Sequence, residues 1–411
     1  MSNKVKNAFF KNFFNLSLNQ GINILVAIIV TPILFQNLGE SEYGLVNLAF
    51  SIVMILSIIV SYGYHLNGPK RISLLNTIEE KKELINEIIS LRISLAFITT
   101  VLIYFLITFS NFFIGYENVI MFSLVILYSE ALHPIFYLQG ENNLSILAVT
   151  NAISKLIYVA LIILLIKNPD DSFLVNLLFG GVLSIVYLVF WVSIFLKNNI
   201  RFAWPKADKI IYRIKENFDF FFSSIAGHIS IHGGIIILSN FIDNIELGKF
   251  ALAQRIGMLL RMIPIFITQA VLQNASVINQ NRKSYLNDYL NKFYLKGLLF
   301  TFVIGILVTV TSKWIIIFLS GEEILYSQEI LSLLSFIPFL GMLNFKNIIK
   351  ILVEEKKKIL NKATWITVFF MISLSIIMSF YFGGKGVAIA LLFSEFISFI
   401  IHSILLNNEN K

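Results

Sequence analysis

Cysteine is absent from the chain, charged residues are scarce, and no loop is long enough to form a soluble domain. The lack of cysteine excludes disulfides, zinc–thiolate sites and cysteine nucleophiles. Charged residues make up 14% of the 411 positions, against about 25% in a typical soluble domain, while hydrophobic residues make up 57%. A soluble fold of this length cannot bury so much apolar surface, whereas a bilayer accepts it. The composition therefore predicts an all-α integral membrane protein.

Enzyme signatures are missing as well. The chain has no Gly-rich loop of the kind that cradles phosphates, so we expect no direct use of ATP, and it has no G-x-S-x-G nucleophile motif. His228 and His232 have a spacing that metal sites use, but no acid or third ligand lies near them in the sequence. We therefore expect neither an enzyme nor a metal or other cofactor.

Apolar runs long enough to cross a bilayer recur about twelve times. We place them at residues 13–36, 43–65, 84–109, 117–138, 143–167, 172–196, 218–241, 248–273, 293–319, 325–350, 360–382 and 386–406. They predict a six-helix lobe over residues 1–196, a basic linker over 197–217 and a second six-helix lobe over 218–411.

The distribution of cations indicates which ends of these runs face the cytoplasm. With both termini inside, the cytoplasmic segments hold 23 of the 32 Lys and Arg residues, and the opposite side holds four. This follows the positive-inside rule and predicts cytoplasmic N- and C-termini. It also accounts for the net charge of +8 without a nucleic-acid partner. We expect the basic linker to act as a topology signal and to contact anionic membrane lipids.

One pattern occurs twice, half a chain apart. Its first copy reads Glu42-x-Gly44-x-x-x-Leu48-Ala49-x-x-Ile52, and its second copy reads Glu246-x-Gly248-x-x-x-Leu252-Ala253-x-x-Ile256. Such a match can arise by chance in a chain rich in Leu, Ala and Ile. A true repeat of six spans would relate the halves by an axis along the membrane normal and place a binding site between them near the midplane.

Five cations fall inside the predicted spans, where each costs about 2.5–3.5 kcal/mol on a lipid-facing helix. Lys296 lies near a helix start and can snorkel to the interface. The other four are Arg92, Lys155, Arg255 and Arg261, and few acids are available to pair with them. Structural ion pairs and a water-filled cavity both remain open as explanations for each residue. For the group we predict a cavity that receives an anion.

Polar side chains recur at helical spacing on several of the predicted spans. They include Asn12, Asn15, Asn19 and Asn23 in the first span, Asn151 beside Lys155 in the fifth, His228 and His232 in the seventh, and Gln254 in the eighth. Amide and cationic side chains that face one space suit sugar hydroxyls and phosphate. Hydrogen bonds between helices are the alternative explanation.

Acids at membrane depth are fewer than the cations. Glu130 and His133 are three residues apart, just before Pro134, and Glu395 lies in the last span. Intramembrane carboxylates and histidines often relay protons, although structural hydrogen bonds explain this spacing equally well.

Three stretches resemble one known family. Asn19–Gly21, Thr31–Pro32 and Asn37–Leu45 resemble its first-span ending and its L-G-x-x-x-Y-G-L turn. Pro134–Gly140 and Asn151–Lys155 are similar to its P-x-W-x-F-Q-G and N-x-I-S-K patterns, with Phe136 where Trp is usual. The third stretch, Glu246–Arg255, resembles its second-half turn. The family is that of the Wzx-type O-antigen and capsule repeat-unit flippases, in the polysaccharide-transport branch of the MATE-like MOP superfamily.

This resemblance implies a V-shaped pair of six-helix lobes around a cationic cavity in the bacterial cytoplasmic (inner) membrane. By alternating access, the cavity would pass an undecaprenyl-pyrophosphate-linked oligosaccharide repeat unit from the cytoplasmic to the outer leaflet. The resemblance also implies coupling to an ion gradient, for which Glu130, His133 and Glu395 are candidates. A polysaccharide polymerase and a chain-length regulator are candidate protein partners.

Two alternatives stay open. A drug or cation antiporter of the same superfamily predicts acids in the cavity, because its cargo is cationic, whereas cations dominate here. An O-antigen polymerase or ligase is also polytopic, but such enzymes carry a large exterior loop that this chain lacks.

Overall fold

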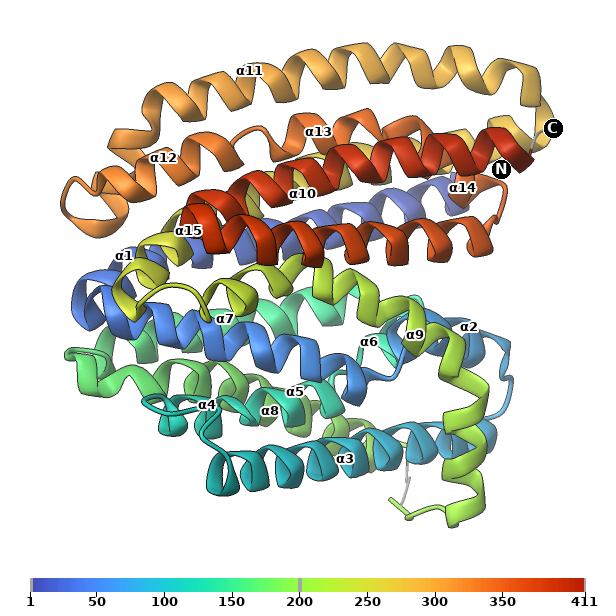
Figure 1. Ribbon diagram of the computed structural model, residues 1–411. Coiled ribbons are helices and arrows are strands. Elements are labelled where there is room, and N and C mark those ends of the chain that lie inside the picture. Colours follow the sequence, from blue (N-terminus) through green and yellow to red (C-terminus); the bar gives the residue numbers. More distant parts are fainter. Residues whose placement is uncertain (1–2, 199–201, 410–411) are drawn as a thin grey trace. The chain divides into compact units, whose positions relative to one another are not determined.

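The computed structural model describes residues 3–198 and 202–409, with side chains described from residue 21 onward except at positions 273 and 283. These residues form helices joined by short turns, and no strand occurs among them. The prediction of an all-α fold is therefore confirmed. The helices are α1 Asn3–Ser61, α2 Tyr64–Leu74, α3 Ile78–Phe109, α4 Glu117–Ser123, α5 Val125–Leu132, α6 Ile135–Gly140, α7 Leu144–Leu165, η1 Pro169–Asp171, α8 Ser172–Lys197, α9 Ala207–Leu238, α10 Asn244–Asn281, η2 Lys283–Tyr285, α11 Leu286–Ser320, α12 Leu325–Leu334, α13 Ile337–Leu343, α14 Phe345–Val353 and α15 Lys357–Glu409 (Figure 1).

Two helices are too long for single membrane crossings, and each contains a glycine that breaks it. Gly39 in α1 has φ 77° and ψ 172°, and Gly383 in α15 has φ 54° and ψ −135°. Residues other than glycine are disfavoured at such positive φ, because their Cβ atom clashes with the backbone. Within the described residues, ten helical segments are long and apolar enough to cross a membrane, and the kinked segments, 21–74 and 357–409, are two of them. Counting both sides of each kink separately gives twelve.

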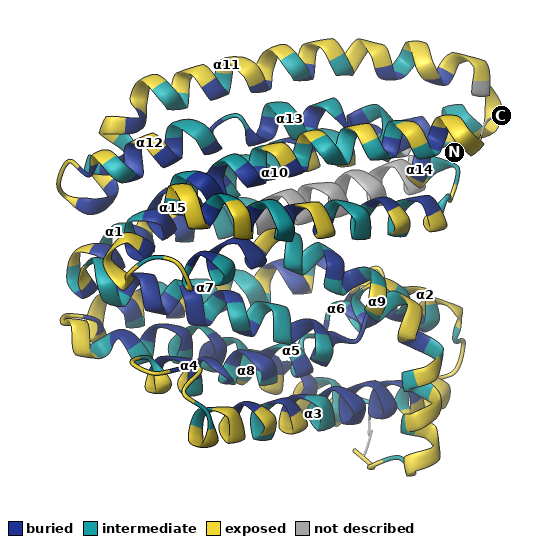
Figure 2. Ribbon diagram, in the orientation of Figure 1, coloured by how far each residue is buried: buried dark blue, intermediate teal, exposed yellow. Residues whose placement is uncertain are grey.

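The chain divides into two compact units, residues 1–228 and 229–411. The core of unit 1 lies where α2, α3, α6 and α8 meet, around Ile88, Phe136 and Trp191. The core of unit 2 lies between α10, α11, α13 and α14, around Leu290 and Met342. Large apolar side chains are also exposed along α11 and along the C-terminal half of α3 (Figure 2). A membrane protein presents such faces to lipid.

The fourth apolar segment of each unit is broken into three short helices. In unit 1 these are α4, α5 and α6, and in unit 2 they are α12, α13 and α14. The sequence repeat has a counterpart in the packing, because Leu48 and Ala49 in unit 1 and Leu252 and Ala253 in unit 2 are all buried. The two units thus share a fourth segment that is broken into three helices, in addition to a sequence pattern with buried Leu and Ala residues.

The expected linker is partly helical, because α9 begins at Ala207 and is continuous to Leu238. Ion pairs attach its first turns to unit 1. Arg213 contacts Glu87 at 2.6 Å and Glu216 at 2.8 Å, Lys209 contacts Glu83 and Glu87, and Arg71 contacts Glu216. We call these six residues the α9 ion cluster. A cavity of 590 Å³ lies beside it and contains none of the predicted site residues.

Candidate functional site

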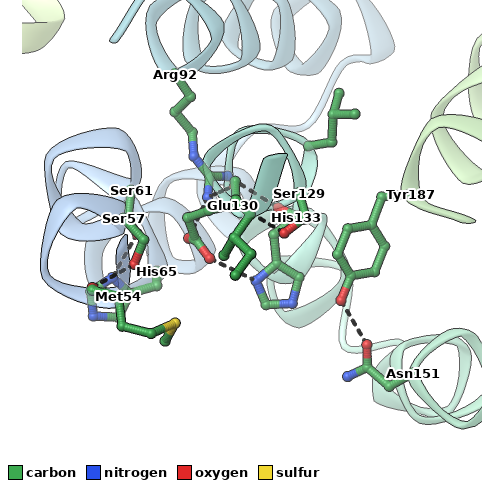
Figure 3. A network of polar contacts seen from close by, with 12 residues as sticks. Met54, Ser57, Ser61, His65, Arg92, Ser129, Glu130, His133, Asn151 and Tyr187 are labelled. Carbon is green, nitrogen blue, oxygen red and sulfur yellow. Dashed lines mark hydrogen bonds and ion pairs between the residues drawn. The ribbon is translucent and has the colours of Figure 1, made fainter. Parts of the chain in front are cut away.

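The centre of the polar network in unit 1 is Arg92, whose side chain is 1% exposed (Figure 3). Its guanidinium donates to Oε1 of Glu130 at 2.7 Å and to the backbone carbonyls of Glu130 and His133, the latter at 3.1 Å. A buried arginine needs both a counter-charge and acceptors for its N–H groups. Glu130 supplies the charge, and the backbone supplies most of the acceptors.

These carbonyls are available because the helix is broken at this point. Pro134 has no N–H to continue the α5 hydrogen-bond ladder, so carbonyls in the last turn of α5 lose their helical donors. Arg92 donates to the Glu130 carbonyl in this turn, which also accepts from the His133 N–H at 3.2 Å, and to the His133 carbonyl just after the helix. The indole N–H of Trp191 donates to the Leu132 carbonyl at 2.7 Å. At membrane depth such groups need partners within the protein. Arg92 therefore serves as a cap for α5.

His133 lies at the break between α5 and α6, where its side chain contacts both Glu130 and Tyr187. Its Nδ1 is 3.9 Å from Oε2 of Glu130, which is close enough for an ion pair but too long for a hydrogen bond. Its ring stacks on Tyr187 with centroids 5.0 Å apart, and the Tyr187 hydroxyl donates to Oδ1 of Asn151 at 2.8 Å. The structure thus brings Arg92, the predicted Glu130–His133 pair and Asn151, which we predicted as three separate features, into one network.

A second ion pair joins predicted residues in unit 2. Arg261 on α10 contacts Oε1 of Glu395 on α15 at 2.5 Å, and another of its nitrogens donates to the Ser230 carbonyl on α9 at 3.3 Å. Its side chain is 30% exposed, against 16% for Glu395. Arg261, a residue predicted to bind the cargo, is therefore in direct contact with Glu395, a residue predicted to couple ion movement.

The other two cations have different surroundings. Lys155 on α7 is half-buried, and its ammonium lies 4.0 Å from the ring centroid of Phe179 on α8. This is a cation–π contact, which leaves a lysine able to meet an anion as well. Arg255 on α10 is also half-buried.

The predicted polar residues are spread over both units. Asn12, Asn15 and Asn19 fall outside the described side chains. In unit 1, Asn23 is half-buried, and so is His228, whose Nδ1 lies 3.2 Å from the Ser224 carbonyl. In unit 2, His232 and Gln254 are buried.

Sequence reasoning missed several polar residues that the structure places at the helix breaks. His65, in the first turn of α2, lies 3.2 Å from the Ser61 hydroxyl, in the region of Glu130 and His133 (Figure 3). His402 on α15 contacts Asn344 at the break between α13 and α14, at 3.2 Å. Histidine is uncommon at membrane depth, and this signal was available in the sequence.

Comparison with known proteins identifies the group to which the chain is similar. Residues 9–273 match the family described as polysaccharide biosynthesis protein. A Shigella dysenteriae protein named "Putative O-antigen transporter" is 26% identical over 393 residues, covering 94% of this chain and 96% of that protein. An Escherichia coli K12 protein of the same name is 22% identical over 270 residues, covering 64% of this chain and 63% of that protein.

Solved structures show the same fold. The lipid II flippase MurJ in an inward closed conformation gives a TM-score of 0.77 at 17% identity, covering 95% of this chain and 87% of that one. A multidrug resistance MATE family transporter of the MOP superfamily, in an inward-facing conformation, gives 0.72 at 14% identity, covering 96% and 97%. The described helices are therefore arranged in the fold that these transporters share.

Proposed function

Because the chain belongs to the polysaccharide biosynthesis protein family, we propose that it is a flippase for lipid-linked polysaccharide precursors. It transfers an undecaprenyl-pyrophosphate-linked oligosaccharide from the cytoplasmic to the outer leaflet for O-antigen or capsule assembly. The single observation that carries this proposal is the family match over residues 9–273. The names of the Shigella and Escherichia relatives support it, because they are names of transporters and not of enzymes.

The proposal includes a topology and a location. The protein crosses the bacterial cytoplasmic membrane twelve times, with both termini inside and six spans in each half. The positive-inside distribution of Lys and Arg supports this arrangement. A polymerase and a chain-length regulator of the same pathway are proposed partners.

We propose Lys155 in unit 1, and Arg255 and Arg261 in unit 2, each as a cation that can meet the cargo's pyrophosphate. Each is partly exposed, and Arg261 has one nitrogen on a carboxylate and another on a single carbonyl. Arg92 is different, because it is buried and its two terminal nitrogens already donate to a carboxylate and two carbonyls, while its Nε–H has no acceptor among the described residues. We therefore assign Arg92 to holding the α5 break, and not to cargo.

The residues proposed for ion coupling are Glu130, His133 and Glu395. Each carboxylate is paired with an arginine at membrane depth, so gaining or losing a proton would change the charge balance of the pair. The polar groups Asn23, Asn151, His228, His232 and Gln254 are proposed to meet sugar hydroxyls.

Deletion of the gene in its host tests the function. We expect lipid-linked repeat units to accumulate in the cytoplasmic leaflet and surface glycan to disappear, with both defects restored by the wild-type gene. Repeat units that reach the outer leaflet but stay unpolymerised would overturn the proposal in favour of a polymerase.

Single introduced cysteines test the assignment of cations, since the chain has no native cysteine. Lys155→Cys and Arg255→Cys should react with a membrane-impermeant polar maleimide in inside-out vesicles. Arg92→Cys provides the matched buried control and should react only after denaturation. Equal protection of all three positions would refute a wet cationic cavity.

A drug antiporter is a second candidate, because the fold is shared with a multidrug MATE transporter. It predicts that cells lacking the protein become sensitive to cationic drugs while surface glycan is unchanged. The excess of cations over acids at membrane depth is the reason that we rank it second.

A further inference from the structure

The ion pair between Arg261 and Glu395 has the geometry of an exchangeable contact. A 2.5 Å distance joins the guanidinium to one carboxylate oxygen, and a 3.3 Å hydrogen bond to the Ser230 carbonyl is the other recorded contact of Arg261. The arginine is the more exposed partner, at 30% against 16%. An incoming anion can therefore approach Arg261 from its exposed side and then compete with Glu395 for the guanidinium.

The corresponding pair in unit 1 lacks this property. Arg92 is 1% exposed, whereas its partner Glu130 is 25% exposed, so the carboxylate is the more accessible member. Three oxygens already accept hydrogen bonds from Arg92. Unit 1 thus contains an Arg–Glu pair whose arginine is buried, and unit 2 contains an Arg–Glu pair whose arginine is accessible.

The surroundings of Glu395 contain few competing charges. On its own helix, His402 lies about two turns further on and is hydrogen-bonded to the Ser398 carbonyl at 2.7 Å. The neighbouring part of α13 contributes Gly341, where an added Cβ would lie 4.0 Å from Oε2 of Glu395. From α10 the charged group is Arg261, with Pro264 nearby, and α9 contributes the Ser230 carbonyl to the pair. Among the described residues, Arg261 is thus the direct ion-pair partner of Glu395, and His402 is its titratable neighbour.

We propose that Glu395 and the cargo's pyrophosphate compete for Arg261, and that Glu395 takes up a proton when the pyrophosphate binds. This inference rests on the proposed function, because it requires an anionic cargo. In the empty state the carboxylate neutralises Arg261. When phosphate oxygens replace it, a carboxylate left beside them would be repelled, and a proton from water neutralises it. One proton is then loaded with one cargo, which makes Glu395 the coupling carboxylate.

The exchange predicts a pH dependence of binding. The probe is undecaprenyl pyrophosphate, and the protein is the full chain in nanodiscs. Above the pH at which Glu395 loses its proton, wild-type binding should weaken by about tenfold per pH unit, beyond any effect of the probe's own titration. Glu395→Gln keeps an oxygen acceptor for Arg261 without a charge, so its binding should follow the titration of the probe alone. Over the pH range in which wild-type binding weakens, Glu395→Gln should bind the probe more tightly than the wild type.

Three variants make the experiment decisive. Arg261→Gln should weaken binding at every pH, and Glu395→Asp should restore the pH dependence that Glu395→Gln loses. Glu329→Gln removes the carboxylate of an exposed ion pair with Lys385 at 2.6 Å, and it should behave like the wild type. In weakly buffered solution, wild type should take up one more proton than Glu395→Gln for each probe molecule bound.

The outcomes separate this inference from the proposed function. If Glu395→Gln binds the probe with the wild-type pH dependence and proton uptake, the exchange is refuted while an anionic cargo stands. If the wild type fails to bind the probe at any pH, both the exchange and the proposed cargo are refuted.

Discussion

Removing the carboxylate of Glu130 should destabilise the protein more than removing a carboxylate from an exposed ion pair of the same length. In Glu130→Ala the guanidinium of Arg92 stays buried in unit 1 with its two carbonyl acceptors but without a counter-charge. Loss of one partner from a buried pair costs about 3–5 kcal/mol. Because Glu130 is itself 25% exposed, we expect the lower end, about 3 kcal/mol. Glu130→Gln keeps an acceptor for Arg92, and it should lose about half as much.

The matched control is Glu329→Ala. The Glu329–Lys385 pair has a 2.6 Å contact, close to the 2.7 Å of the buried pair, but its side chains are 44% and 42% exposed. Exposed pairs contribute about 1 kcal/mol or less. Equilibrium unfolding of the purified variants in mixed micelles, followed by circular dichroism, measures both losses. If Glu130→Ala and Glu329→Ala lose the same free energy, Arg92 does not depend on Glu130 and the reasoning is refuted.

Three further predictions concern packing inside unit 1, and the same unfolding assay checks each of them. Gly63→Ala should lose at least about 2 kcal/mol, because φ is +73° and the new Cβ would lie 2.6 Å from the Cβ of Phe220. Gly181→Ala, inside α8 with open space around it, should instead gain about 0.5–1 kcal/mol from its higher helix propensity. Trp191→Phe should lose about 1–3 kcal/mol, because it leaves a carbonyl at the α5 break without its donor. Asn176→Leu should lose about 1–2 kcal/mol, because its amide donates two buried hydrogen bonds, at 3.0 and 2.9 Å. A silent Trp191→Phe or Asn176→Leu would mean that another donor replaces the missing one.

Most helix positions could be predicted from hydrophobic runs alone. The run at residues 84–109 became α3, Ile78–Phe109, and the run at 172–196 became α8, Ser172–Lys197. Hydropathy works well here because a bilayer forces each crossing to satisfy its own backbone within a helix. It could not predict that α9 begins at Ala207, because that segment is polar and its helical start is held by ion pairs with unit 1.

The candidate site was predictable by residue type but not by pairing. Arg92 and Glu130 are 38 positions apart, and Arg261 and Glu395 are 134 apart, so no local spacing links them. The role of Arg92 depends on carbonyls freed at Pro134, and this is a property of the backbone break that residue identity does not reveal. His65 and Tyr187 join the network for the same reason, since tertiary packing brings them to the break.

The α9 ion cluster changes what the basic character of this region means. Counted along the chain, the stretch around α9 looks like a positively charged belt that would attract acidic phospholipids. In space, Arg71, Lys209 and Arg213 each contact an acid, and the cluster as a whole carries three positive and three negative charges. The field that reaches the lipid headgroups from these six residues is therefore close to that of a neutral surface. Lysines outside the cluster, such as Lys206 and Lys215, are the residues that attract anionic lipid to this region. The positive charge that the lipid experiences is therefore smaller than the number of Lys and Arg residues in the sequence implies.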